Sequence, residues 1–330
     1  MKYTFITIMH NLKFDSVMNK GIKLFPGARL SNGNELLRNL FNYDLMKNTV
    51  GSHSLDEFEG KVYCYITNEL MEIKTKEDMD KIGTSFTFYL LRIVQSFLMD
   101  LWEVKDNNIY ARDGFLVVYE DSIENGFTYK SSLSAIFSNS TLDSNETWYT
   151  RGELDQAIKK FQENVSDMFK FDSSINYKTP TDDIFFKNKN SNRMERAFYF
   201  VLAARGNSAL PMKIVYYCTA LECLFSTAKT EINYRIAERI ALMLGDNGTE
   251  RKRYFNLIKK AYDVRSTIVH GSSLKGKSEE LEEVSKGLDQ VLRKLMITDN
   301  DIFNKEDKEI EDYFLNIIFD SGSKEDGSFT

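Results

Sequence analysis

The chain has 330 residues, of which 42% are hydrophobic and 13% aromatic, enough for one large or two ordinary cores; this excludes disordered, collagen-like and disulfide-framed proteins. Its 43 basic and 49 acidic residues give a formal net charge of −6, which excludes general charge-driven binding of polyanions and restricts any nucleic-acid contact to a local surface. Only three prolines interrupt the chain, so we expect long helices.

Cysteine usage and hydropathy indicate where such a chain would be found. The three cysteines include no C-x-x-C pair, so they fit neither a disulfide framework nor a thiolate zinc site and are typical of a reducing compartment. Residues 1–8 have no long apolar core followed by a cleavage site, and the most apolar stretch, residues 86–99, is interrupted by Arg92 and Gln95. We therefore expect a cytoplasmic protein without a membrane-spanning segment.

The first half of the chain mixes strand and helix patterns. Residues 3–9, 61–67 and 114–120 are short runs of β-branched and aromatic side chains, which predict strands. Residues 82–104 and 151–171 carry apolar side chains at helical spacing, which predicts two helices. We predict an α+β domain with a sensing or regulatory role over residues 1–171.

A polar segment, residues 172–192, is interpreted as a linker, and from residue 193 the pattern is helical. Helices are predicted at residues 193–205, 212–228, 232–244, 250–269, 279–296 and 308–319. Residues 193–297 then form a helical-bundle domain, and residues 298–330 form an acidic helical extension. The predicted protein is mainly α, with an α+β domain first.

Arg265 occupies the middle of an apolar helical stripe. On a helix over residues 250–270, six side chains lie within about 60° of it: Tyr254, Ile258, Ala261, Tyr262, Ile268 and Val269. A guanidinium cannot lose its charge, so its burial requires a carboxylate, a polar network, a subunit interface or a phosphate. The alternative is an arginine at the rim of a packed face that reaches water.

His270 lies five residues later, just before Gly271, which is the expected left-handed cap of this helix. The exposed carbonyls of a helix C-terminus favour positive charge, which suits an imidazole to acid–base chemistry. Arg265 and His270 differ by about 140° around the axis. Only the length of the arginine, or a second copy of the helix, could bring both groups to one phosphate.

Three motifs lie on successive predicted helices: ALECLF at residues 220–225, Glu231-Ile232 together with RIALMLG at residues 239–245, and YDVRSTIVHG at residues 262–271. In this order they resemble the HEPN superfamily, specifically its Apea-like branch, over about residues 193–297. The resemblance implies a helical bundle that dimerises so that two Arg-x(4–6)-His motifs face one cleft. Many such proteins are metal-independent endoribonucleases that act in defence or stress responses.

By this resemblance, Arg265 and His270 are the catalytic pair. His270 would accept the proton of an RNA 2′-hydroxyl and Arg265 would stabilise the developing charge, which leaves a 2′,3′-cyclic phosphate. The implied partners are RNA and a second copy of the chain, with no metal or other cofactor.

The resemblance also gives supporting roles to Glu222, Arg239, Asp263 and Ser266. Glu222 is suited to an ion pair with Arg239 or Arg265, and structural pairing is favoured over a direct catalytic role. Many catalytic members carry Asn, Asp or His where this chain has Ser266. That departure favours a second hypothesis, a catalytically inactive HEPN module that binds RNA or a protein partner.

Basic residues flank the same helix, at Arg251, Lys252, Arg253, Lys259 and Lys260. They predict either a track for the RNA backbone or an ordinary solvated helix face.

Residues 271–278 match the phosphate-binding pattern G-x-x-x-x-G-K-[ST]. A nucleotide-binding loop follows a parallel strand, whereas the preceding residues predict a helix, so we interpret the match as a loop before a helix that starts at Ser278. The sequence therefore requires no nucleotide. His10 and His53 have no acidic or cysteine neighbours at ligand spacing, so no metal site is predicted either.

Overall fold

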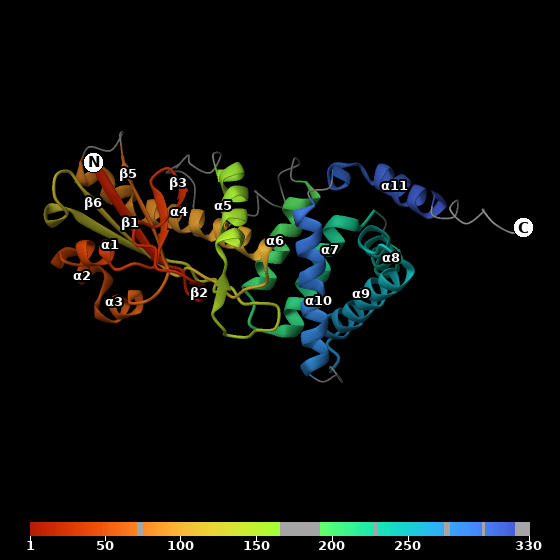
Figure 1. Ribbon diagram of the computed structural model, residues 1–330. Coiled ribbons are helices and arrows are strands. Elements are labelled where there is room, and N and C mark those ends of the chain that lie inside the picture. Colours follow the sequence, from red (N-terminus) through yellow and green to blue (C-terminus); the bar gives the residue numbers. More distant parts are fainter. Residues whose placement is uncertain (71–74, 166–191, 228–229, 274–277, 299–300, 321–330) are drawn as a thin grey trace, which may run out of the picture. The chain divides into compact units, whose positions relative to one another are not determined.

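The computed structural model describes residues 1–70, 75–165, 192–227, 230–273, 278–298 and 301–320 (Figure 1). The chain forms two compact units: Met1–Phe137 with Asp143–Thr181, and Ser138–Leu142 with Asp182–Thr330. The described part is rich in helices and carries its main sheet in the first unit, which confirms a mainly α protein with an α+β N-terminal part. The predicted linker, apart from Asn192, lies outside the described residues.

An antiparallel sheet of six strands, in the order β3-β4-β5-β1-β6-β7, forms the centre of the first unit. The three predicted strands lie together in its middle, where Ile6 stands opposite both Tyr65 and Phe115. A separate parallel pair joins β2 to β8. The strands are β1 (Lys2–Ile8), β2 (Leu12–Phe14), β3 (Ile22–Phe25), β4 (Ala28–Ser31), β5 (Tyr63–Glu69), β6 (Asp113–Tyr119), β7 (Phe127–Ser132) and β8 (Thr147–Tyr149).

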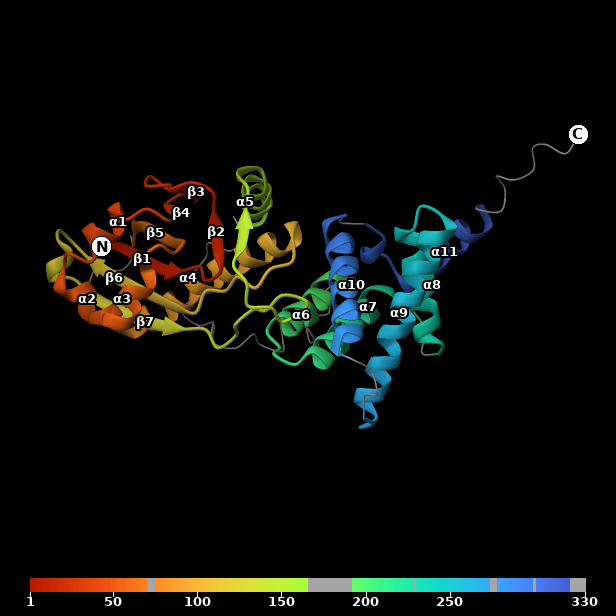
Figure 2. The same ribbon diagram turned by 60° about the horizontal axis from the view of Figure 1, so that its bottom comes forward.

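Helices cover both faces of this sheet because successive strand residues point to opposite sides (Figures 1 and 2). Ile6 and Phe115 pack in a core with residues of α1 (Glu35–Leu40), α2 (Asp44–Val50) and α3 (Ser52–Phe58). Phe5 points the other way and meets Leu91 of α4 (Lys76–Val104) at Gly114, where there is no room for a larger side chain. α5 (Arg151–Val165) packs against α4.

The long helix α4 begins six residues before its predicted start, because Thr75 caps it by accepting a hydrogen bond from the Asp78 amide at 3.2 Å. By length and hydropathy α4 could cross a membrane, yet 72% of its most apolar window is buried within the protein. That burial is expected of a central core helix. α5 starts as predicted, and the last six residues of its predicted range lie outside the described part of the chain.

The second unit is a bundle in which α7 contacts α6, α8, α9 and α10, so α7 is its central helix (Figures 1 and 2). Two of the helices, α6 and α8, have the predicted bounds, and the others begin or end within a few residues of them. The helices are α6 (Arg193–Arg205), α7 (Leu210–Phe225), α8 (Ile232–Leu244), α9 (Gly248–Val269), α10 (Ser278–Ile297) and α11 (Asp307–Asp320).

Two arginines determine where α7 ends. It stops at Phe225 instead of residue 228, and its last carbonyls accept hydrogen bonds from guanidinium groups of other helices. Arg193 Nη1 donates to the carbonyls of Cys223 and Ser226 at 3.1 and 2.8 Å, and Arg239 Nη1 donates to that of Phe225 at 2.6 Å. Basic side chains thus satisfy carbonyls that have no partner within the helix.

A five-residue strap, Ser138–Leu142, belongs to the second unit although the chain on either side of it belongs to the first. Lys213 on α7 is fully buried, and its ammonium donates to the Ser138 hydroxyl and the Ala204 carbonyl, both at 2.9 Å. Ser285 on α10 donates to the Ser140 carbonyl at 2.6 Å. The strap is therefore built into the bundle, which the sequence pattern did not predict.

Candidate functional site

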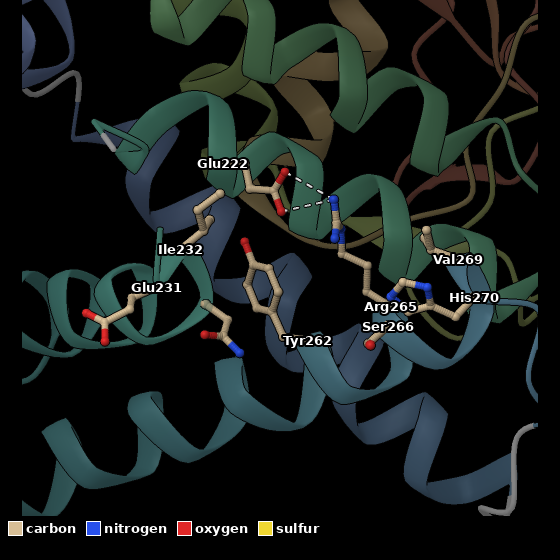
Figure 3. A pocket seen from close by; sticks show the side chains of 9 residues that line it. Glu222, Glu231, Ile232, Tyr262, Arg265, Ser266, Val269 and His270 are labelled. Atoms are coloured by element: carbon tan, nitrogen blue, oxygen red, sulfur yellow. Dashed lines mark hydrogen bonds and ion pairs between the residues drawn. The ribbon is translucent and has the colours of Figure 1, made fainter. Parts of the chain in front are cut away.

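A pocket of about 330 Å³ lies between the C-terminal end of α9, the last turn of α7 and the start of α8 (Figure 3). α9 contributes Arg265, Ser266 and His270, three of the residues predicted to form the site. The pocket is lined by Glu222, Glu231, Ile232, Asn233, Tyr262, Arg265, Ser266, Val269 and His270. Groups 140° apart on an ideal helix thus border one pocket within a single chain.

Glu222 holds the Arg265 guanidinium across this pocket. Arg265 Nη2 lies 3.2 Å from Glu222 Oε1 and 3.3 Å from Oε2, so one nitrogen contacts both carboxylate oxygens. The two side chains are 31% and 22% exposed, so solvent reaches the pair, and exposed pairs contribute little to stability. Of the two pairings expected for Glu222, the structure contains the one with Arg265.

The Tyr262 ring lies beside this ion pair. Its side chain is buried, and the Arg265 guanidinium lies 5.8 Å from the ring centroid. In Figure 3 the Tyr262 hydroxyl and the Glu222 carboxylate point toward one another. Yet within the described part of the chain the hydroxyl makes no hydrogen bond, and neither does Arg265 Nε, although both atoms are buried. Burial raises the pKa of Tyr262 most, and Glu222 raises it further, both by its charge and as a hydrogen-bond acceptor within reach of the hydroxyl.

His270 is the C-terminal cap of α9 and is exposed at the rim of the pocket. Its amide donates to the Ser266 carbonyl at 3.0 Å, and Gly271 follows with a φ of +71°, which confirms the predicted left-handed cap. The Ser272 amide closes the turn on the Thr267 carbonyl at 2.9 Å. This turn fixes the backbone from which the imidazole projects.

Two residues predicted to support the site lie away from the pocket lining. Asp263 is exposed, and its backbone carbonyl accepts the Thr267 hydroxyl at 2.8 Å. Arg239 caps α7 and also donates to the Thr227 hydroxyl at 3.0 Å, with Glu311 on α11 at 3.9 Å. Its contacts make Arg239 a structural residue of the bundle.

The predicted RNA-binding residues lie nearer the start of α9 and do not line the pocket. Lys252, Arg253 and Lys260 are exposed, whereas Lys259 is partly buried and Arg251 Nε donates to the Gly245 carbonyl at 3.1 Å. The Arg253 guanidinium lies 4.9 Å from the Tyr254 ring centroid. The structure therefore leaves three of the five with exposed charges on α9.

The residues at the start of α8 also line the pocket; Glu231 and Ile232 belong to the second motif of the sequence, which gave them no role. Glu231 has a left-handed φ of +54°, and it brings Ile232 and Asn233 to the pocket. Such a backbone angle in a glutamate marks a tight turn, but no sequence signal predicts it. Tyr262 stands in the motif, three residues before Arg265 and so on the same helix face, which is the signal that could have identified it.

The phosphate-loop match follows a helix in the structure, because α9 runs to Val269 where a nucleotide-binding loop would follow a strand. Residues 274–277 lie outside the described part, and α10 starts at Ser278 as interpreted from the sequence. Among the described residues, no three His, Cys, Asp or Glu side chains are grouped as metal ligands.

Comparison with known proteins assigns no family. The chain matches no protein-family model, and it matches no curated protein and no solved structure. The geometry of the pocket and the motifs of the sequence are therefore the observations that bear on function.

Proposed function

We propose that the chain is a HEPN-type, metal-independent endoribonuclease with Arg265 and His270 as its catalytic residues. The observation that carries this proposal is that Arg265, Ser266 and His270 border one open pocket at the end of α9. A cation, a hydroxyl and an imidazole within one concave site are the groups that a phosphodiester transition state needs. The helices that form the pocket, α7, α8 and α9, are those that carry the three HEPN-like motifs.

The proposed reaction is transfer of a phosphodiester within the RNA. His270 takes the proton of a 2′-hydroxyl, the 2′-oxygen bonds to the adjacent phosphorus, and the bond to the 5′-oxygen breaks. A proton passes to that 5′-oxygen, so the products are a 2′,3′-cyclic phosphate and a 5′-hydroxyl, with no net change in protons. Arg265 stabilises the negative charge that builds on the phosphoryl oxygens. The α+β unit is assigned a sensing or regulatory role.

The proposed enzyme is a homodimer in which the pockets of two copies contribute to one cleft. Val269 at the pocket and Tyr234 next to Asn233 are 57% and 51% exposed, so the pocket has apolar neighbours that a second copy would cover. The exposed cations of α9 would extend the anion-binding surface along the RNA backbone.

A catalytically inactive module that binds RNA or a protein partner is the second candidate. Two observations favour it: Arg265 is held by Glu222, and Ser266 stands where many catalytic relatives of this type carry a stronger polar group. In that case the pocket binds an anion without cleaving it.

Cleavage of labelled RNA in EDTA distinguishes the two candidates. We expect the wild-type chain to cut RNA, and Arg265→Ala and His270→Ala each to lower the single-turnover rate by about 100-fold or more. Arg38→Ala and His53→Ala are matched controls, because both residues are exposed in the first unit. RNA that stays intact while all variants bind it equally would contradict the nuclease and favour the binding module.

A further inference from the structure

Tyr262 presents a buried hydroxyl that the structure does not otherwise explain. Its side chain is 6% exposed, it lines the pocket, and its hydroxyl has no hydrogen-bond partner among the described residues. A buried hydroxyl without a partner costs about 1–3 kcal/mol, so native proteins seldom keep one. A phenylalanine would fill the same space without this cost.

Glu222 is the acceptor that the Tyr262 hydroxyl is placed to bind. Among the described residues Arg265 Nη2 donates to this carboxylate, and the Tyr262 hydroxyl points toward it, within reach but without the geometry of a hydrogen bond (Figure 3). A phosphate in the pocket would compete with Glu222 for the guanidinium, because both are oxyanions that match its donors. Glu222 would then lose its partner and face a second negative charge.

We propose that Tyr262 is a positioning residue. When a phosphate group of RNA binds Arg265 and displaces the Glu222 carboxylate, the Tyr262 hydroxyl donates a hydrogen bond to that carboxylate. The inference rests on the proposed function, since it takes the ligand to be the phosphate of RNA. The exchange replaces one pair by two: Arg265 binds the phosphate and Tyr262 binds Glu222. The partnerless hydroxyl of the ligand-free protein is thereby satisfied in the complex.

The electrostatics of the pocket agree with this exchange. Burial and the nearby carboxylate raise the pKa of Tyr262, so the hydroxyl keeps its proton at neutral pH and remains a donor. Arg265 Nε is a second buried donor without a partner in the described part of the chain, and it is available to the same phosphate.

A double-mutant cycle between Tyr262→Phe and Glu222→Gln tests the exchange in the full chain. The probe is a fluorescein-labelled 2′-O-methyl oligoribonucleotide, which has no 2′-hydroxyl to attack and is therefore not cleaved. We expect Tyr262→Phe to weaken binding by about tenfold, because Glu222 then loses its partner in the complex. In the Glu222→Gln background the same change should weaken binding by less than about threefold.

Two further readouts separate positioning from a structural role. Tyr262→Phe should leave the melting temperature unchanged or raise it, because it removes a partnerless buried hydroxyl. Glu222→Gln alone should bind the oligonucleotide more tightly, because Arg265 is released without an exchange. If Tyr262→Phe folds poorly, this variant still tests the first step, because unchanged or weaker binding by Glu222→Gln would show that phosphate does not displace Glu222 from Arg265 and would overturn the inference.

Equal losses from Tyr262→Phe in both backgrounds, no loss in either, or no oligonucleotide binding by the wild-type chain would overturn the inference. RNA cleavage by the same preparations is a separate measurement. If the cycle shows the expected coupling while no RNA is cut, the exchange stands and the nuclease assignment fails.

Discussion

Arg265 is the residue on which the proposed function depends most. It keeps its charge on a packed helix face because Glu222 and solvent share it, and this leaves the guanidinium at the edge of a pocket. The sequence predicted that such a charge needs a carboxylate, an interface or a phosphate. Which arginine Glu222 would pair with, Arg239 or Arg265, could not be predicted, because the choice depends on how α7, α8 and α9 pack.

Asp100 on α4 is a charged residue whose burial has a measurable consequence. It is 9% exposed, and burial together with the neighbouring Glu103 raises its pKa to about 8, although Lys160, which is paired with Glu103, acts in the opposite direction. In the unfolded chain the carboxyl titrates near its ordinary pKa of about 3.9. The contribution of the protonated Asp100 carboxyl to the free energy of unfolding is therefore complete below about pH 4, and it is lost as the pH rises to 8.

We expect Asp100→Asn to be more stable than the wild-type chain at pH 8, by roughly 2 kcal/mol or more, and equally stable near pH 4. The amide mimics the protonated carboxyl and does not titrate. Urea unfolding followed by tryptophan fluorescence measures this, because both tryptophans, Trp102 and Trp148, lie in the first unit. Asp56→Asn on α3 is the exposed control, and a difference that does not change with pH would contradict the account.

At the scale of elements, helix starts and ends follow their capping groups. α6 has its predicted bounds because Asn192 and Glu195 form a capping box, whereas α7 ends early because Arg193 and Arg239 cap its carbonyls from other helices. The capping box of α6 is local, so the sequence predicts it. The arginine caps of α7 are tertiary contacts, which the sequence does not predict.

The same distinction explains which strands and helices were predicted. β1, β5 and β6 lie in the middle of the sheet and are rich in β-branched and aromatic side chains, so their pattern is strong. β3 and β4 are four residues long, and α1, α2 and α3 have six or seven residues. Elements this short show too few periods for a pattern to emerge, and their stability comes from packing on the sheet.

We expect the contacts of Lys213 with the strap to stabilise the bundle. Lys213→Met should lower the unfolding free energy of the second unit by about 1–3 kcal/mol, because the Ser138 hydroxyl and the Ala204 carbonyl lose a charged donor. Chemical unfolding followed by far-ultraviolet circular dichroism measures this, with Lys252→Met as the control, because Lys252 on α9 is exposed. If both variants unfold at the same denaturant concentration as the wild-type chain, the Lys213 ammonium does not stabilise the strap.

At the scale of the whole molecule, the function proposed here requires two copies. Light scattering after size-exclusion chromatography should give a mass of about twice the 38.3 kDa of one chain at micromolar concentration. Val269→Asp places a charge on the exposed apolar surface beside the pocket and should shift the population toward monomer. Exposed Val17→Asp in the first unit is the matched control, and a monomeric wild-type chain would contradict the shared cleft.

Analysis of the ends of the RNA products tests the central claim most directly. The wild-type chain is incubated in EDTA with an oligonucleotide that has one ribose among 2′-O-methyl sugars, and the products are weighed by mass spectrometry. The account predicts a single cut at that ribose with a 2′,3′-cyclic phosphate and a 5′-hydroxyl, lost in Arg265→Ala and His270→Ala. Products with a 5′-phosphate, or the same cut made by His270→Ala, would contradict it.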